Sequence, residues 1–207
     1  MLVIGAQGHA KEILQIFEEA ADGRRIVFYD NINADTLLFG RFPILNSPEQ
    51  AALEFRTDDQ FVLGIGGSDT RYKLMMQFAS MGGTASSVIS KSADIGSFDV
   101  NLGVGINIMK QVFISNSVSI GEGSLINFGC NIHHDVSIGK YCELSPKCQV
   151  LGRSQVGDFC SIGAGAIILP KLRVGNNVII GAGAVVTRDI DNNCVVAGVP
   201  ARKLRDL

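Results

Sequence analysis

An aliphatic residue recurs at every sixth position across the second half of the chain, without interruption. A helix would turn residues six apart by about 240°, and antiparallel hairpins would break the period with turns of varied length. A period of six is typical of short strands that turn a corner and stack, three sides to a coil. The sequence therefore predicts a parallel β-helix of about five coils. The series is Leu102, Ile108, Ile114, Ile120, Ile126, Ile132, Ile138, Leu144, Val150, Val156, Ile162, Ile168, Val174, Ile180 and Val186.

A second inward position falls four residues after each member of this series and holds mostly small or aliphatic side chains. Four of the five cysteines occupy it, and the fifth, Cys194, lies beyond the repeat. A thiol inside such a prism acts as a small hydrophobe. We therefore expect buried structural thiols, without a disulfide, metal or catalytic role, at Cys130, Cys142, Cys148 and Cys160.

The first half of the chain alternates apolar strands with helical patterns. Strands are expected at 2–4, 26–29, 61–65 and 84–89, and helices from Ala10, near 48–55 and over 69–80, with a loop through Pro43. This alternation predicts a small parallel sheet of Rossmann-like type. The expected fold is thus α/β plus β: a small Rossmann-like domain (1–88), a β-helix (89–192) and a C-terminal tail (193–207).

Ligands bind parallel sheets at the carboxyl ends of the strands, where three loops are expected. The loop Gly5-Ala6-Gln7-Gly8-His9 lacks the third glycine of the dinucleotide fingerprint, so by itself it is equally consistent with a tight turn. Asp30 and Asn31 end the next strand, and this combination favours nucleotide binding. A phosphate would then lie on the amides of Gly8 and His9 at the start of a helix.

Composition narrows the classes of partner. The chain has 207 residues, 18% of them charged, 24 glycines and a net charge of −2. Without a long basic run, nucleic acid and anionic membranes are poor partners. The apolar start Met1–Gly5 is too short for a signal peptide, and no stretch is long enough to span a bilayer. We therefore expect a cytoplasmic protein.

The β-helix carries its histidines in one repeat, Ile132-His133-His134-Asp135-Val136. With Ile132 and Val136 inward, the residues between them form an outward corner where Asp135 can orient the His134 ring and raise its proton affinity. A solvated polar corner without function is the alternative. A zinc site is disfavoured because adjacent histidines diverge and His9 belongs to another domain. With no activated nucleophile in register, a general base points to direct transfer onto an amine or hydroxyl.

These motifs together resemble a known family. The hexapeptide series, the His134-Asp135 corner, two Ile-Gly-Ala-Gly-Ala rungs (162–166 and 180–184) and Ala197–Arg202 are similar to the left-handed β-helix acyltransferases. The N-terminal motifs narrow the resemblance to bacterial sugar acetyltransferases. These include sialic-acid O-acetyltransferases and N-acetyltransferases of nucleotide-linked 4-amino sugars.

The resemblance implies roles for individual residues. It makes His134 the proton acceptor, Asp135 its acidic neighbour and Asn127 a polar residue near the reaction centre. The implied acceptor contacts are Gln7, Gly8, His9, Asp30, Asn31 and Gly66. Acetyl-CoA would lie in a groove between two prisms of a homotrimer, touching Glu143, Gly152, Ala164 and Ala182. Two positions depart from the family: Asn31 replaces an acid, and Glu143 stands where some relatives have a histidine that touches acetyl-CoA.

The expected function is acetyl transfer from acetyl-CoA, without a metal, to the amine of a nucleotide-linked amino-deoxy sugar in surface-glycan biosynthesis. One alternative is O-acetylation of sialic acid or another free sugar. Another is a non-catalytic scaffold that binds sugar nucleotides.

Overall fold

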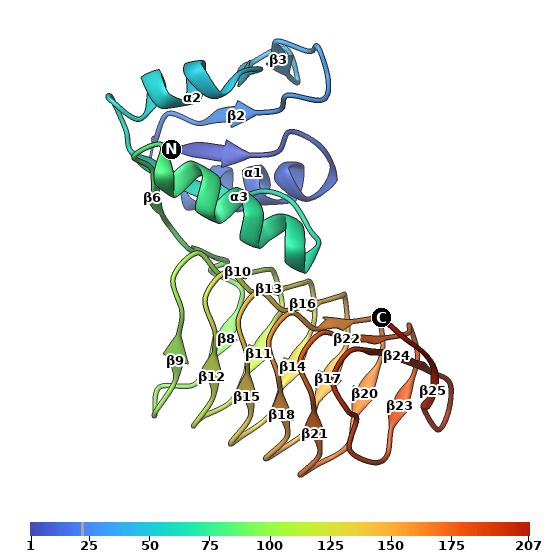
Figure 1. Ribbon diagram of the computed structural model, residues 1–207. Coiled ribbons are helices and arrows are strands. Elements are labelled where there is room, and N and C mark those ends of the chain that lie inside the picture. Colours follow the sequence, from blue (N-terminus) through green and yellow to red (C-terminus); the bar gives the residue numbers. More distant parts are fainter. Residues whose placement is uncertain (22) are drawn as a thin grey trace. The chain divides into compact units, whose positions relative to one another are not determined.

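The computed structural model describes residues 1–21 and 23–207, which form two compact units. The first comprises Met1–Gly66 and Thr70–Val88. The second comprises the short segment Gly67–Asp69 and all of Ile89–Leu207 (Figure 1).

The first unit is built on a six-stranded sheet of order β3-β4-β2-β1-β5-β6. Its central strands pair in parallel and are almost entirely buried, as is usual in a parallel sheet covered on both faces. This confirms the predicted small parallel-sheet domain. The strands are β1 (Leu2–Ile4), β2 (Val27–Tyr29), β3 (Leu37–Leu38), β4 (Phe42–Leu45), β5 (Gln60–Leu63) and β6 (Thr84–Ala85), and the helices are α1 (Gly8–Ala20), α2 (Pro48–Glu54) and α3 (Ser68–Ser80).

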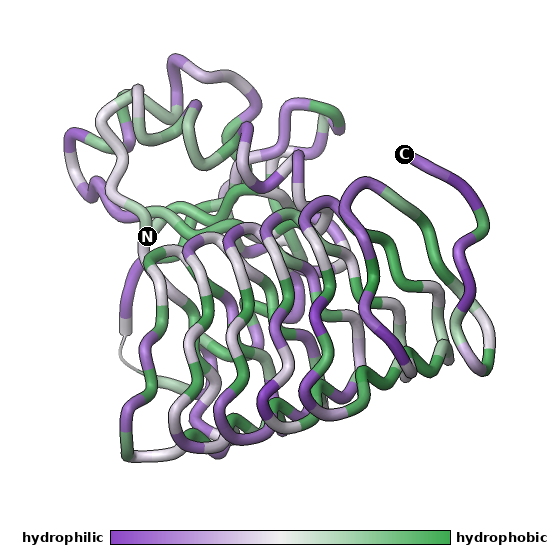
Figure 2. The backbone as a smooth tube through the Cα atoms, turned by 60° about the horizontal axis from the view of Figure 1, so that its bottom comes forward, coloured by the Kyte–Doolittle hydropathy of each residue, from purple (hydrophilic) through white to green (hydrophobic). Residues whose placement is uncertain are grey.

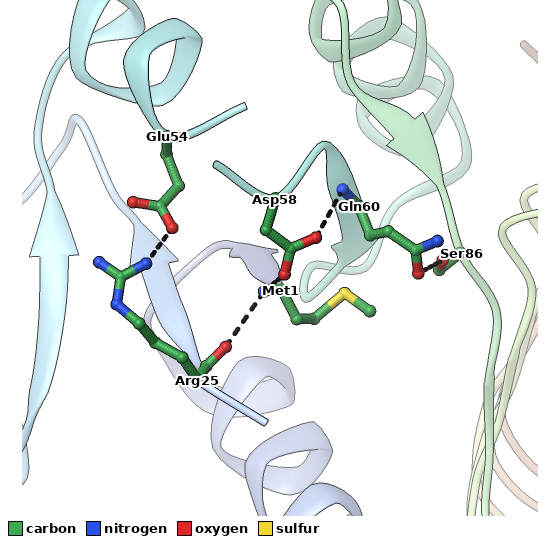
Figure 3. A network of polar contacts seen from close by, with 6 residues as sticks. All are labelled: Met1, Arg25, Glu54, Asp58, Gln60 and Ser86. Atoms are coloured by element: carbon green, nitrogen blue, oxygen red, sulfur yellow. Dashed lines mark hydrogen bonds and ion pairs between the residues drawn. The ribbon is translucent and has the colours of Figure 1, made fainter. Parts of the chain in front are cut away.

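A polar network ties together the amino ends of the three central strands (Figure 3). The amino group of Met1 contacts the Asp58 carboxylate and donates to the Arg25 carbonyl at 3.1 Å. Asp58 also accepts from the Gln60 amide at 3.1 Å, and Arg25 pairs with Glu54. These contacts cover the amino ends of the strands. The loops at the carboxyl ends lie at the opposite end of the sheet.

The expected loop through Pro43 is wrong, because this segment forms the hairpin β3–β4. Its turn places Phe39 and Gly40 in the left-handed region, with φ of 52° and 64°, a conformation that sequence patterns do not predict for phenylalanine. Strand β4 then pairs in parallel with β2, with Ile44 beside Phe28. Pro43 lies opposite Leu37 and comes before the residues of β4 that pair with β2, which are Ile44 and Leu45, so the proline stands at the start of that pairing.

The expected single strand over 84–89 is also wrong. It is two strands: β6 pairs with β5 in the first sheet, whereas β7 (Val88–Ile89) joins a sheet of the β-helix. Ser86 and Ser87 separate the two strands, but no glycine or proline marks a break there, so the sequence does not reveal where the chain changes sheets.

The second unit is a prism of three parallel sheets that the chain visits in turn. The first contains β7, β10 (Asn107–Ile108), β13 (Leu125–Ile126), β16 (Glu143–Leu144), β19 (Ser161–Ile162), β22 (Val178–Ile180), β24 (Cys194–Ala197) and antiparallel β25 (Arg202–Asp206). The second contains β8 (Asp94–Ile95), β11 (Phe113–Ile114), β14 (Asn131–Ile132), β17 (Gln149–Val150), β20 (Ile167–Ile168) and β23 (Val185–Val186). The third contains β9 (Asn101–Leu102), β12 (Ser119–Ile120), β15 (Ser137–Ile138), β18 (Gln155–Val156) and β21 (Arg173–Val174).

The predicted register of the β-helix is confirmed. Residues eighteen apart stack, as Ile108 does on Ile126 and Ile132 on Val150. The hexad series is buried from Ile108 to Val186 and half-buried at Leu102. Hydrophobic positions recur along every coil in Figure 2. Tight corners need glycine: a Cβ on Gly139 would lie 2.6 Å from the carbonyl carbon of Gly157 in the next coil.

The predicted burial of the four inward cysteines is confirmed. All five are free and buried, and the Cys148 thiol contacts the Cys130 sulfur of the previous coil at 3.5 Å. Beyond the repeat, Cys194 donates to the Asp191 carbonyl at 3.3 Å from the closing hairpin β24–β25. The thiols fill the core and face no solvent.

Candidate active site

The corner between β14 and β15 presents the His134–Asp135 pair to solvent. The side chains are 59% and 48% exposed, so a substrate can reach them, and Nδ1 of His134 lies 2.8 Å from Oδ2 of Asp135. The hydrogen bond with His134, and then the charges of His134 and Arg153, hold the pKa of Asp135 below its ordinary value. An ionised Asp135 orients the ring with its Nδ1–H toward the carboxylate. This leaves Nε2 as the proton acceptor.

The coil above supports the ring through Gly152. The Arg153 amide donates to the His134 carbonyl at 3.0 Å, which aligns the two coils. A Cβ on Gly152 would lie 2.7 Å from both Cε1 and Nε2 of His134. The ring therefore lies against the Gly152 backbone. The family resemblance assigned Gly152 to acetyl-CoA and did not suggest this contact. Gly152 follows His134 by eighteen residues, which is one full coil, and this spacing could have predicted that the two residues stack.

His133 and Asn127 have other surroundings. The His133 ring packs edge-on to Phe113, with centroids 6.1 Å apart, so it is a wall of the corner. Asn127 lies at the next corner back, between β13 and β14, and its side-chain oxygen accepts from the Phe128 amide at 2.8 Å. Because this bond uses the side-chain oxygen, the side-chain NH2 group of Asn127 is the part that a substrate could contact.

The residues expected to contact acetyl-CoA do not share one corner. Ala164 and Ala182 are exposed and stack on the corner between the first and second sheets, where the Gly183 amide donates to the Ala164 carbonyl at 2.9 Å. Gly152 lies instead against the His134 ring, between the second and third sheets. Glu143, in β16 of the first sheet, accepts from the Gly67 amide at 2.5 Å. Within one chain, Ala164 and Ala182 are thus on a different corner from His134.

The first unit has a hollow of about 350 Å³ at the carboxyl ends of its strands. All six predicted acceptor residues line it: Gln7, Gly8, His9, Asp30, Asn31 and Gly66. The other lining residues include Ile32, Asn33, Thr70 and Leu74, which were not expected because no motif marks them. The side chain of Gln7, the residue before α1, makes no hydrogen bond to the helix amides, so the first amides of this helix can receive an anion.

Asp30 shapes the loop at one side of this hollow. Its carboxylate accepts from the Ile32 amide at 2.9 Å, the Asn33 amide at 3.2 Å and the Asn33 side chain at 2.9 Å. Burial alone would raise the pKa of Asp30, but these bonds and one from Gln7 hold it below its ordinary value. Asp30 is only 7% exposed, whereas Asn31 is exposed.

Among residues 1–21 and 23–207, no three metal-binding side chains are grouped as a metal ion requires. No helix in the described part of the chain is long and apolar enough to cross a membrane.

A hexapeptide β-helix with an exposed histidine–aspartate corner, preceded by a Rossmann-like unit, defines a class of acyltransferases. Residues 1–78 match the PglD N-terminal domain, and residues 153–188 match the bacterial transferase hexapeptide (six repeats). No curated protein sequence matches the chain.

Solved structures match over nearly the whole chain. PerB from Caulobacter crescentus, in complex with CoA and GDP-perosamine, is 29% identical, with a TM-score of 0.89 over 99% of this chain and 96% of that one. WeeI from Acinetobacter baumannii is 27% identical, with a TM-score of 0.89 over 98% of both chains. The acetyltransferase domain of PglB from Neisseria gonorrhoeae, with acetyl coenzyme A, is 25% identical, with a TM-score of 0.87 over 98% of both chains. The chain belongs to the left-handed β-helix sugar acetyltransferases with a PglD-type N-terminal domain.

Proposed function

We propose that this enzyme transfers the acetyl group of acetyl-CoA to the amine of a nucleotide-linked amino-deoxy sugar. The main support is the presence, in one chain, of a hollow at the carboxyl edge of a parallel sheet and an exposed His134–Asp135 pair. The similarity to PerB, whose structure contains CoA and GDP-perosamine, supports the same acceptor class. Because acetyl-CoA and nucleotide sugars are cytoplasmic metabolites, we assign the reaction to the cytoplasm.

In this reaction His134 is the general base. The amine nitrogen attacks the thioester carbonyl, a C–N bond forms, and Nε2 of His134 takes the proton that the nitrogen loses. Asp135 stabilises the imidazolium through the 2.8 Å contact. The tetrahedral intermediate collapses with cleavage of the C–S bond, and the thiolate leaves readily because a thiol has a pKa near 8.5. Backbone N–H groups along the groove stabilise the oxyanion.

The first unit holds the acceptor. The diphosphate lies on the amides of Gly8 and His9, where the α1 dipole favours negative charge. The base or ribose lies near Asp30 and Asn31. Placing the anion on the helix, away from the ionised Asp30, separates the like charges.

The working assembly is a homotrimer, and the donor site lies between two copies. His134 occupies one corner of the prism and Ala164 and Ala182 another, so a pantetheine chain that touches both needs corners from two prisms. Large apolar side chains exposed on the second unit fit such an association: Phe98, Val104, Phe128 and Ile179.

Acetyl-CoA turnover with a panel of acceptors tests the proposal. We expect a nucleotide-linked amino sugar to be acetylated, and GDP or UDP to compete with the acceptor but not with acetyl-CoA. Equal turnover of a nucleotide-free sugar, without inhibition by either diphosphate, would instead establish the sialic-acid type of O-acetylation. Absence of turnover with every acceptor would favour the scaffold.

Substitution of the base tests the mechanism. His134→Ala is expected to retain the trimer and acetyl-CoA binding and to lose about 10²–10⁴-fold in kcat, the usual contribution of a general base. Asp135→Asn should cost less, and His133→Ala, whose ring packs on Phe113, less again. Turnover near the wild-type rate by His134→Ala would contradict the assignment.

A further inference from the structure

Arg71 is the largest fully buried side chain of the described chain, with 0% exposure. It lies in α3, and its Nη1 donates to the carbonyls of Leu63 at 3.3 Å and Ile65 at 2.8 Å. Burying a guanidinium costs free energy unless its N–H groups find hydrogen-bond acceptors. Both bonds go to the segment that leaves β5, and this segment borders the acceptor hollow.

The peptide geometry of this segment gives the two bonds a consequence. In a trans peptide the C=O and the following N–H point in opposite directions. The Leu63 carbonyl points to Arg71, and the next amide, Gly64, donates the opposite way, to the Ile4 carbonyl of β1 at 2.8 Å. The Ile65 carbonyl also points to Arg71. The Gly66 N–H is therefore directed to the β1 side, where the Gly5–His9 loop lies.

The two loops meet there closely. A Cβ on Gly5 would lie 2.6 Å from Cγ2 of Ile65 and 2.8 Å from the Gly64 carbonyl oxygen, and both segments line the hollow. Among the described backbone groups, the Gly66 amide donates to no carbonyl. The Gly66 N–H therefore faces the hollow from one side, and the first amides of α1 face it from the other.

We infer that Arg71 is an acceptor-positioning residue: by holding the Ile65 carbonyl, it turns the Gly66 N–H toward a phosphate oxygen of the nucleoside diphosphate. The inference rests on the proposed function, because it assigns a partner to the diphosphate that the first unit binds. The guanidinium does not touch the ligand. It sets the peptide orientation, and its buried positive charge strengthens the site for an anion.

The test is binding of GDP and UDP by calorimetry, with CoA as the control ligand, for wild type, Arg71→Gln and Arg71→Lys. We expect Arg71→Gln to weaken the diphosphate about tenfold, the effect of losing one hydrogen bond to a charged group. Arg71→Lys, which keeps the charge and can reach one carbonyl, should recover part of this loss. The CoA affinity should stay within twofold. In kinetics, the acceptor KM rises while the KM for acetyl-CoA does not.

A second pair of variants guards against a folding defect at a buried arginine. Gly66→Pro removes the N–H, and Gly66→Ala, which keeps it at a backbone φ outside the left-handed region, is its reference. We expect the proline variant to bind the diphosphate about tenfold more weakly than the alanine variant. Equal diphosphate affinity within either pair of folded proteins, wild type with Arg71→Gln or alanine with proline, overturns the inference. If wild type binds neither GDP nor UDP, the proposed acceptor class itself fails.

Discussion

Replacing Gly152 by alanine should displace the ring of His134, the proposed general base, without unfolding the protein. The added Cβ would lie 2.7 Å from Cε1 and Nε2 of His134, whereas ordinary contact begins at 3.4 Å. The ring must therefore withdraw by about 0.7 Å. Its side chain is 59% exposed, so it has room to turn. We expect the free energy of unfolding to change by less than about 1 kcal/mol.

The effect on catalysis should be larger than the effect on stability. A displacement of about 1 Å in a reacting group can cost a factor of about 10², and the shift also disturbs the 2.8 Å contact between His134 and Asp135. We therefore expect kcat to fall roughly 30–100-fold, which corresponds to about 2–3 kcal/mol in the activation free energy. Neither substrate's KM should change by more than about threefold, because the clash is with the His134 ring and not with a proposed binding contact of the acceptor.

Steady-state kinetics with thermal melting would measure both effects. The control is the same substitution in the His134→Ala protein, where no ring remains to clash and alanine should cost nothing more. A kcat within threefold of wild type would refute the argument. A selective rise in the KM for acetyl-CoA would show that Gly152 serves the donor instead, as the family resemblance implies.

Two other predictions concern the core and the acceptor loop. Thiol reagents should react slowly with the folded protein, because burial hides the thiols, and alanine at any one inward cysteine should leave activity largely intact. A rapidly labelled thiol in the native protein would contradict this. Asp30→Ala should raise the acceptor KM far more than the donor KM, because the loop loses three hydrogen bonds; equal rises would count against an acceptor-side role. The lowered pKa of Asp30 means that its stabilisation is present above its ordinary pKa of about 4 and disappears at lower pH, so melting curves of wild type and Asp30→Ala should converge in acid.

The sequence by itself determined the prism and the residues that fill it. The signal is strong because a parallel β-helix repeats its backbone every eighteen residues, so one local pattern specifies the same stacking in every coil. The same regularity located the outward His134–Asp135 corner and the inward thiols. The glycine loop and Asp30 likewise indicated one edge of a sheet, since the ends of parallel strands meet there.

Only the tertiary structure decided which groups meet across coils and loops. The hairpin β3–β4 depends on the left-handed backbone conformation of Phe39, which the residue type does not predict. Gly152 became a support for His134 only once two corners were stacked. In the sequence, Arg71 is an ordinary polar position of the helix expected over 69–80. Its burial against two carbonyls follows from the packing of α3 on the end of β5. No repeating pattern in the sequence predicts a side-chain contact of this kind.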